Sequence, residues 1–322
     1  MPLRLRFAEA DLLRCRFAVS PLCETHEAVR TLLRPARHGY HQAWLGTEIP
    51  DLGPLRLLMP KFGYTPDFLG PPPAAPLGRT ADFGDEIARL RATDPSLAHD
   101  EMRRSFASTG ADPTDPHHQR LLDDPAEAIH ALADATERAW HALVAPHWDR
   151  LRTVLEADIA QRSRRMAEGG LGALFADLHR DLRWDGGTLT LHAGSAMLDQ
   201  ELDGRGLLLM PSVFAWPEAI SGFAPPWQPT VIYPALGMAR AWETRPAPGS
   251  LTRLIGANRA ALLTTLDEPA STTGLAQRHG LAASTVSAHL AVLRDAGLVT
   301  ARRQGHEVLY HRTALGSALL GQ

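Results

Sequence analysis

The sequence predicts an α+β protein with a mostly helical N-terminal domain that carries a small antiparallel sheet, and a smaller C-terminal domain of helices and one hairpin. Three observations support this prediction. Apolar residues recur every three or four positions across residues 83–184. Over residues 185–234 apolar and polar residues alternate instead. A helix–turn–helix–hairpin pattern begins near residue 249. The chain has 322 residues, 44% of them hydrophobic and 21% charged, which is enough material for two globular cores.

The N-terminal region opens with mixed short elements. Ser20 followed by Pro21 predicts a helix start, because serine caps the free N–H groups and proline suits the first helical position. Residues 65–78 contain five prolines and predict an extended connector, since proline cannot donate a backbone hydrogen bond.

Residues 83–184 predict a series of amphipathic helices. One of them has Asp124 as its cap, Pro125 at its first position and a broad apolar face that includes Trp140. The stretch between helices at residues 108–125 is rich in turn residues, so it predicts an exposed loop that contains the His117–His118 pair.

The change of period after Trp184 predicts the small antiparallel sheet. "DGG" at 185–187 and "DGRG" at 203–206 are turn signals, and "TLTLH", "LLLMPSVFAW" and "PTVIYP" are strand-like. "RPAPGS" at 245–250 predicts a linker. The predicted domains are therefore residues 1–245 and residues 249–322.

The charge distribution separates the two parts. Residues 249–322 hold seven Arg against four acidic residues, a net +3, whereas the whole chain has a net charge of −3. A mildly basic tail on an acidic body is typical of a nucleic-acid-binding module joined to another domain. Two cysteines without zinc spacing and no long apolar run predict a reduced, cytoplasmic protein without membrane contact.

The C-terminal domain predicts three helices and a hairpin in a fixed order. A first helix runs through residues 251–268, with Leu254 on its core side, and a short helix follows from Ser271 or Thr272 to Gly280. A tight turn leads to the helix at 284–296, and residues 299–311 form a hairpin that turns at Gly305. This order is that of a winged helix-turn-helix.

The segment "GLAASTVSAHLAVLRDAGLVTARRQGHEVLYHRT" resembles the ArsR family of bacterial regulators. Their recognition helix reads S-x-x-S-x-H-L-x-x-L-x-x-A-G-L-V before a basic wing that ends near "LY". The resemblance covers residues 249–322, and the long N-terminal region is similar to that of large actinobacterial members, whose N-terminal domain has no agreed function. It implies a cytoplasmic, homodimeric transcriptional regulator, a repressor that binds double-stranded DNA at an inverted-repeat operator.

The motif and the groove chemistry together predict the DNA-contacting residues. Short polar side chains on the recognition helix would face base edges, helix N-termini would bind phosphate, and the wing would carry charge to the backbone or minor groove. Ser284 is expected to cap the recognition helix. The predicted residues are Thr272, Thr273, Ser284, Thr285, Ser287, Ala288, His289, Arg294, Arg302, Arg303 and His306.

Alternatives remain open for several of these assignments. His289 is also compatible with a half-buried structural role, and Arg294 with an ion pair near Asp295. Ala288 can contact a thymine methyl group but cannot hydrogen-bond a base, whereas family members often carry Gln or Arg there. A winged helix can also serve protein–protein contacts.

The sequence departs from the family at the sensing and dimerisation sites. The helix before the turn, "STTGLAQRHG", lacks the cysteine motif of the metal-sensing members. The terminal "LGSALLGQ" is short for their dimerisation helix, so the N-terminal domain is expected to supply the dimer contacts.

No enzymatic motif is present in the N-terminal domain. G-x-S-x-G, H-E-x-x-H, a phosphate loop and G-x-G-x-x-G are all absent. We therefore expect no catalytic activity, no metal and no cofactor, and instead a domain that senses a small-molecule effector or mediates dimerisation. The alternative is an enzyme or ligand-binding domain fused to a regulatory winged helix.

Overall fold

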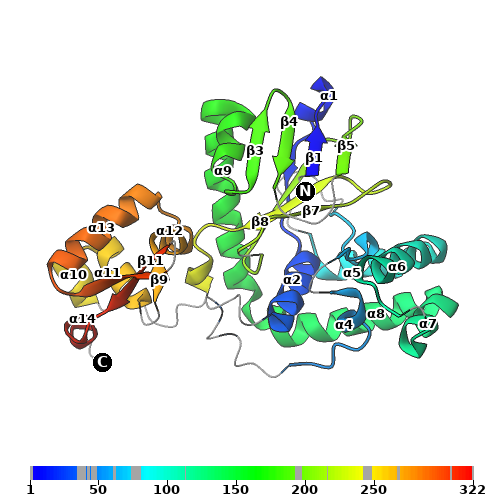
Figure 1. The fold of residues 1–322 in the computed structure, drawn as a ribbon, viewed down its shortest axis with the longest axis horizontal. Coiled ribbons are helices and arrows are strands. Elements are labelled where there is room, and N and C mark those ends of the chain that lie inside the picture. The colour runs from blue at the N-terminus through cyan, green and yellow to red at the C-terminus, as the bar shows by residue number, and fades with distance from the viewer. Residues whose placement is uncertain are drawn as a thin grey trace. The chain divides into compact units, whose positions relative to one another are not determined.

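The computed structural model describes residues 3–34, 41, 44, 49–60, 63–73, 81–112, 114–192, 198–215, 217–241, 249–266, 269–304 and 307–320 (Figure 1). The chain forms two compact units, Met1–Ala235 and Leu236–Gln322. The division falls ahead of the predicted linker because the turn η6 (Met238–Ala241) packs with the C-terminal unit. Gly237 N–H donates to the carbonyl oxygen of Gln277, 2.5 Å away.

The helical part of the N-terminal unit begins at α2, where Ser20 accepts a hydrogen bond from the Cys23 N–H at 2.9 Å, as predicted. Asp124 caps α8 in the same way, with Pro125 at the first position. The described helices and helical turns are α1 (Glu9–Leu12), α2 (Pro21–Leu33), α4 (Leu55–Leu58), η3 (Asp67–Leu69), α5 (Phe83–Arg91), α6 (Pro95–Thr109), α7 (Pro116–Asp123), α8 (Pro125–Ala139), η4 (Trp140–Val144), η5 (Ala145–His147) and α9 (Trp148–Ala176).

One local prediction in this region was wrong. The His117–His118 pair lies in the first turn of α7 and not in a loop, because Asp115 caps that helix and Pro116 begins it. The described part of the proline-rich segment, residues 65–73, contains the turn η3 and is largely buried, so it belongs to the packed body of the unit. Residues 74–78 of the predicted connector lie outside the described residues.

Within the described residues, the N-terminal unit has two four-stranded sheets. The first has the order β3-β4-β1-β5 and the second the order β2-β6-β8-β7. Their strands are β1 (Leu3–Arg6), β2 (Arg16–Phe17), β3 (Leu182–Asp185), β4 (Thr188–Leu191), β5 (Leu198–Glu201), β6 (Leu208–Ser212), β7 (Ile220–Gly222) and β8 (Thr230–Pro234).

The α+β class is confirmed, but the sheets are mixed and not one antiparallel sheet. β1 pairs with β5, β2 with β6 and β6 with β8 in parallel, and the remaining pairs are antiparallel. The second sheet is covered on both faces: Leu208 and Met210 of β6 contact the α2 side, while Leu209 packs into the core shared with α9 and the first sheet. Burial on both faces explains the unbroken apolar run in β6.

The C-terminal unit has one core that helices and a three-stranded sheet share. The single predicted helix over 251–268 is in fact two, because Gly256 adopts φ 85° between them; Leu254 is consequently 71% exposed. The elements are α10 (Gly249–Ile255), α11 (Ala257–Thr265), β9 (Ala270–Ser271), α12 (Thr272–His279), α13 (Ala283–Asp295), β10 (Val299–Gln304), β11 (Glu307–Arg312) and α14 (Ala314–Leu319).

Gly316 allows α14 to approach the backbone just before β10 closely. A Cβ atom at this position would overlap the carbonyl oxygen of Leu298 and crowd Cγ of Arg312. We expect Gly316→Ala to lower the free energy of unfolding of the C-terminal unit by about 1–3 kcal/mol, measured by thermal unfolding with circular dichroism. Gly172→Ala is the control, because its Cβ would meet only Trp184 Cδ1 at 3.7 Å; equal effects of the two variants would contradict the prediction.

Within the part of the chain that the structure describes, no helix combines the length and apolar character needed to cross a bilayer.

Candidate nucleic-acid interface

The first helix of the helix-turn-helix, α12, begins after a side-chain cap. Ser271 Oγ accepts a hydrogen bond from the Gly274 N–H at 3.2 Å. Thr272 and Thr273 therefore occupy the first two helical positions, where Thr273 is exposed and Thr272 half-buried. The positive end of the helix dipole and N–H groups without a helical partner lie at this terminus, as a phosphate contact requires.

The turn between α12 and α13 closes with Gly280 in the left-handed conformation, at φ 64°. Ala282 is extended and stands at the N-cap of α13 without a side-chain hydrogen bond. The prediction that Ser284 caps the helix was wrong, because the short turn lets α13 begin at Ala283 and places Ser284 inside its first turn. Ser284 is exposed there.

The burial pattern of α13 leaves one face available to a partner. Val286, Leu290 and Leu293 are at most 1% exposed and hold the helix on the core of the unit. Thr285, Ser287, Ala288 and Arg294 are exposed on the other side, while His289 is half-buried. Arg294 lies 3.8 Å from the Asp295 carboxylate in an exposed ion pair, which agrees with the alternative considered for it. Gly297, at φ 71°, follows the end of the helix.

The wing is a six-pair antiparallel hairpin of β10 and β11, and β9 pairs with β11. Arg302 lies opposite Leu309 and Arg303 opposite Val308. Successive strand residues point to opposite faces, so the two arginines project on opposite sides of the hairpin. Both are exposed. The predicted turn at Gly305 and the predicted contact His306 lie outside the described residues.

The alternation of side chains between the two faces of the wing adds two residues to the candidate contact set that the motif did not indicate. Thr300 and His311 face each other across the hairpin, two positions from the Arg302–Leu309 pair, and therefore share its face. The period of two in the sequence from 299 to 304 and from 307 to 312 contained this information.

Some of the arginines that make the C-terminal unit basic have internal partners. Arg312 Nε donates to Ser317 Oγ at 3.1 Å, and Nη1 lies 3.4 Å from the carbonyl oxygen of Leu263. Arg278 Nη1 lies 3.4 Å from the carbonyl oxygen of Thr265. These side chains hold helices and wing together, so the net charge of the unit overstates the charge that faces a partner.

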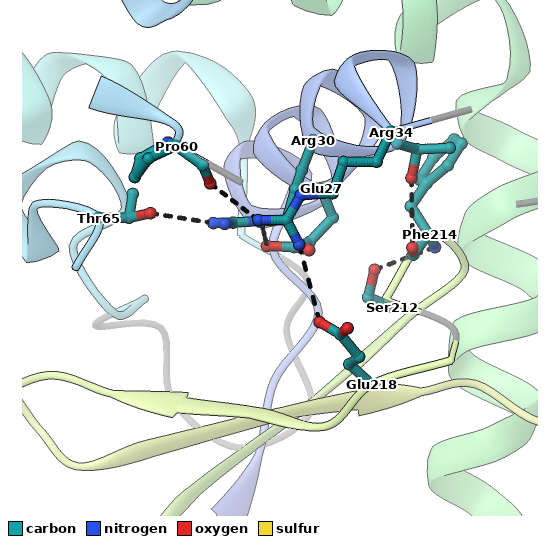
Figure 2. Close-up of polar contacts among 9 residues, drawn as sticks. Glu27, Arg30, Arg34, Pro60, Thr65, Ser212, Phe214 and Glu218 are labelled. Atoms are coloured by element: carbon teal, nitrogen blue, oxygen red, sulfur yellow. Dashed lines mark hydrogen bonds and ion pairs between the residues drawn. The ribbon is translucent and has the colours of Figure 1, made fainter. Parts of the chain in front are cut away.

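The N-terminal unit contains a separate polar cluster on α2, which we call the α2 cluster. Figure 2 shows its members, which come from α2, from its C-cap residue and from the segments that follow α4 and β6: Glu27, Arg30, Arg34, Pro60, Thr65 and Glu218. Arg30 Nε donates to Glu27 Oε1 at 3.3 Å, and Arg34 Nη2 donates to the carbonyl oxygen of Pro60 at 2.8 Å. The guanidinium groups of Arg30 and Arg34 thus have hydrogen-bond partners within the fold, and these hydrogen bonds join α2 to the loops around it.

Buried carboxylates continue this polar layer around α2. Both oxygens of Glu24, which is 1% exposed, accept hydrogen bonds from the Val213 N–H, at 3.2 and 3.1 Å. Glu86 accepts from Ser20 Oγ at 3.0 Å and from the Leu22 N–H at 2.8 Å. Burial raises the pKa of Glu24 to about 8 and that of Glu86 to about 7. Among the described residues, no group of three or more His, Cys, Asp or Glu side chains is arranged to hold a metal ion.

Comparison with known families assigns the two parts of the chain separately. Residues 257–302 match a helix-turn-helix domain family, over α11, α12, α13 and most of β10. The C-terminal unit is an ArsR-like winged helix-turn-helix domain. Residues 83–239 match a family of unknown function, DUF5937. The recognised ArsR-like winged helix-turn-helix domain is thus joined to an N-terminal region whose own family has no assigned role.

Two solved structures are similar to part of the chain. Reduced HlyU from Vibrio cholerae is 28% identical, over 23% of this chain and 85% of its own, with a TM-score of 0.20. A protein described as a possible transcriptional regulator for arsenical resistance is 28% identical, over 24% of this chain and 79% of its own, with a TM-score of 0.19. No curated protein matches the sequence.

Proposed function

We propose that this chain is a DNA-binding transcriptional regulator, a homodimeric repressor that acts in the cytoplasm on an inverted-repeat operator. The observation that carries the proposal is the helix-turn-helix match over residues 257–302 together with the exposed polar face of α13. A buried face of three aliphatic residues fixes α13 on the domain and turns Thr285 and Ser287 outward. The N-terminal unit serves as the effector-sensing or dimerisation domain and has no catalytic role.

The recognition helix fits the dimensions of duplex DNA. A major groove about 12 Å wide admits one α-helix, and residues in the N-terminal half of that helix contact the base edges. Thr285, Ser287 and His289 of α13 provide hydroxyl and imidazole groups for those edges, and Ser284 in its first turn lies nearer the backbone. The N-terminus of α12, with Thr272 and Thr273, is directed at a phosphate.

The wing supports contacts on two sides. Arg302 and Arg303 project from opposite faces of one hairpin, which suits a hairpin edge that lies between the two phosphate strands bordering a minor groove. Thr300 and His311 extend the Arg302 face toward the body of the domain. His306 remains part of the proposed contact set, as does Arg294 in the last turn of α13.

Selection of genomic DNA fragments by the purified full-length protein tests the proposal. A two-fold symmetric dimer presents its recognition helices about 34 Å apart, one helical turn of B-DNA. We expect enrichment of one inverted repeat with that half-site spacing and a dimer in the bound complex. Failure to enrich any sequence would instead favour a winged helix used for protein–protein contacts, and a small-molecule turnover by the N-terminal unit would favour the enzyme alternative.

Replacing both Arg302 and Arg303 by alanine should weaken binding to all DNA sequences to a similar extent. Each phosphate contact releases about one counterion, so the slope of log K against log salt concentration should become less steep by about 2. The measurement is fluorescence anisotropy of labelled duplexes at several salt concentrations.

Because the two arginines lie on opposite faces, each single variant should account for about half of that change. Arg103→Ala is the control, since its side chain is 71% exposed on α6 of the N-terminal unit and should leave the slope unchanged. A slope that stays the same in the double variant would remove both arginines from the DNA contact set.

A further inference from the structure

The recognition helix α13 lacks the side chains that usually distinguish bases by paired hydrogen bonds. Residues 283–292 read "ASTVSAHLAV" and contain no Asn, Gln, Arg, Lys, Asp or Glu. Bidentate readout of guanine uses Arg or Lys, and that of adenine uses Asn or Gln. The first such side chain is Arg294, which stands in the last turn of the helix and pairs with Asp295 at 3.8 Å.

The exposed side chains of the first two turns are all short. Ser284, Thr285, Ser287 and Ala288 are exposed, and none extends more than two heavy atoms along the chain from Cα. A helix with such a surface can lie closer to the base edges than one that carries Arg or Gln. Thr285 and Ala288 are three residues apart, so they are neighbours on one face, and each presents a methyl group.

A thymine displays a methyl group in the major groove, at the place where cytosine carries only a hydrogen. Contact between that methyl and Thr285 Cγ2 or Ala288 Cβ removes apolar surface from water on both sides. A base pair that presented a hydrogen-bonding group to these methyl groups would lose the water bound to that group and gain no partner in its place, which is unfavourable. The side-chain set of α13 therefore favours thymine over the other bases at these positions.

We propose that α13 recognises thymine methyl groups through Thr285 and Ala288, so that the preferred DNA contains a thymine in each half-site opposite these two residues. This inference rests on the proposed function, because it concerns the same helix and the same groove. It defines the ligand as duplex DNA whose specific contacts are van der Waals contacts to pyrimidine 5-methyl groups. Ser287 and His289 contribute hydrogen bonds beside these contacts.

Deoxyuridine substitution tests the methyl contact directly, because it removes the 5-methyl group and leaves base pairing unchanged. The full-length protein first selects its preferred duplex from a random pool, and each thymine of that duplex is then replaced singly by deoxyuridine. We expect one or two positions per half-site at which the dissociation constant rises about fourfold, the value for one buried methyl group. At the same positions, the protein should bind a duplex that carries 5-methylcytosine more tightly than one that carries cytosine.

Protein variants assign the contact to its side chains. Thr285→Ser removes one methyl group and keeps the hydroxyl. At the thymine that residue 285 faces, deoxyuridine substitution should then no longer raise the dissociation constant. Ala288→Gly should do the same at the second position, with thermal unfolding as the check that the domain is folded. Thr285→Val keeps a methyl group and should retain the effect. The matched change Thr153→Ser, at an exposed position on α9 of the N-terminal unit, should alter neither position.

The outcomes separate this inference from the proposed function. A discrete selected sequence with no deoxyuridine effect at any thymine would overturn methyl recognition and leave the regulator intact. An effect that persists unchanged in Thr285→Ser and Ala288→Gly would overturn the assignment to these residues. Absence of any selected sequence would overturn both proposals.

Discussion

Replacing Arg162 by leucine should lower the free energy of unfolding of the N-terminal unit by about 3–5 kcal/mol. Arg162 is 3% exposed on α9, and its Nε lies 3.5 Å from Oδ1 of Asp158, which is 1% exposed. Its Nη1 donates to the carbonyl oxygen of Asp177 at 2.6 Å, and Asp158 accepts from the Tyr233 hydroxyl of β8 at 2.7 Å. The leucine variant would leave the Asp158 carboxylate buried without its cation.

Urea unfolding followed by tryptophan fluorescence measures this effect. Six of the seven tryptophans lie in the N-terminal unit, so the signal reports mainly that unit. Arg152→Leu is the matched control. Arg152 lies on the same helix, its Nε is 3.5 Å from Oε1 of Glu156, and its side chain is 47% exposed. Exposed pairs contribute at most about 1 kcal/mol. A loss in Arg162→Leu no larger than in the control would show that the buried pair does not hold α9 to the sheet.

The parts of the candidate site that depend on local spacing could be predicted from the sequence. The burial of Val286, Leu290 and Leu293 follows from the helical period. The termination of α13 just before Gly297 follows from the left-handed conformation that glycine tolerates. The cap was misplaced because Ser284 is a good N-cap residue in isolation. The turn after Gly280 decided the matter, and its length is set by packing of α12 against α13.

The sheets of the N-terminal unit could not be predicted in this way. β1 and β2 come from the first 17 residues, yet they pair with strands near residues 190, 200 and 208, and nothing local in the sequence specifies such partners. The α2 helix shows a related difficulty. Glu24 and Glu27 look like solvent-facing positions in the sequence but are 1% and 4% exposed, because hydrogen bonds from distant segments satisfy the first and Arg30 the second.

The buried carboxylates around α2 predict a stability that declines as pH rises above neutrality. Burial is the largest cause that raises the pKa of Glu24 from 4.5 to about 8, with the Glu27 charge adding to it and the hydrogen bonds from Ser212 and Val213 opposing it. Burial likewise raises the pKa of Glu86 to about 7. The pKa of His26 is lowered to about 3, first by burial and then by the Arg30 charge.

A carboxyl whose folded pKa lies above its unfolded value stabilises the fold fully below the unfolded pKa, and that stabilisation is lost as pH rises through the folded pKa. His26 acts in the opposite sense, and its effect fades as pH rises above its unfolded pKa of 6.5, because the unfolded imidazole then also becomes neutral. Between pH 6.5 and 8 the carboxyls therefore dominate the pH dependence. Each proton that the folded state retains lowers the free energy of unfolding by about 1.4 kcal/mol per pH unit. The free energy of unfolding should therefore fall by about 2–3 kcal/mol over this range.

Urea unfolding at pH 6.5, 7.25 and 8.0, followed by tryptophan fluorescence, measures the decline, and Glu24→Gln identifies its source. The amide oxygen of glutamine can still accept from the Val213 N–H, but the side chain no longer titrates, so the slope should become shallower by about one proton. Glu201→Gln is the control, because its side chain is 63% exposed beside Arg6 and its loss should leave the slope as it is. If Glu24→Gln keeps the full slope, the proton that the folded chain retains near pH 8 is not on Glu24, and the assignment of the decline to this carboxyl is wrong.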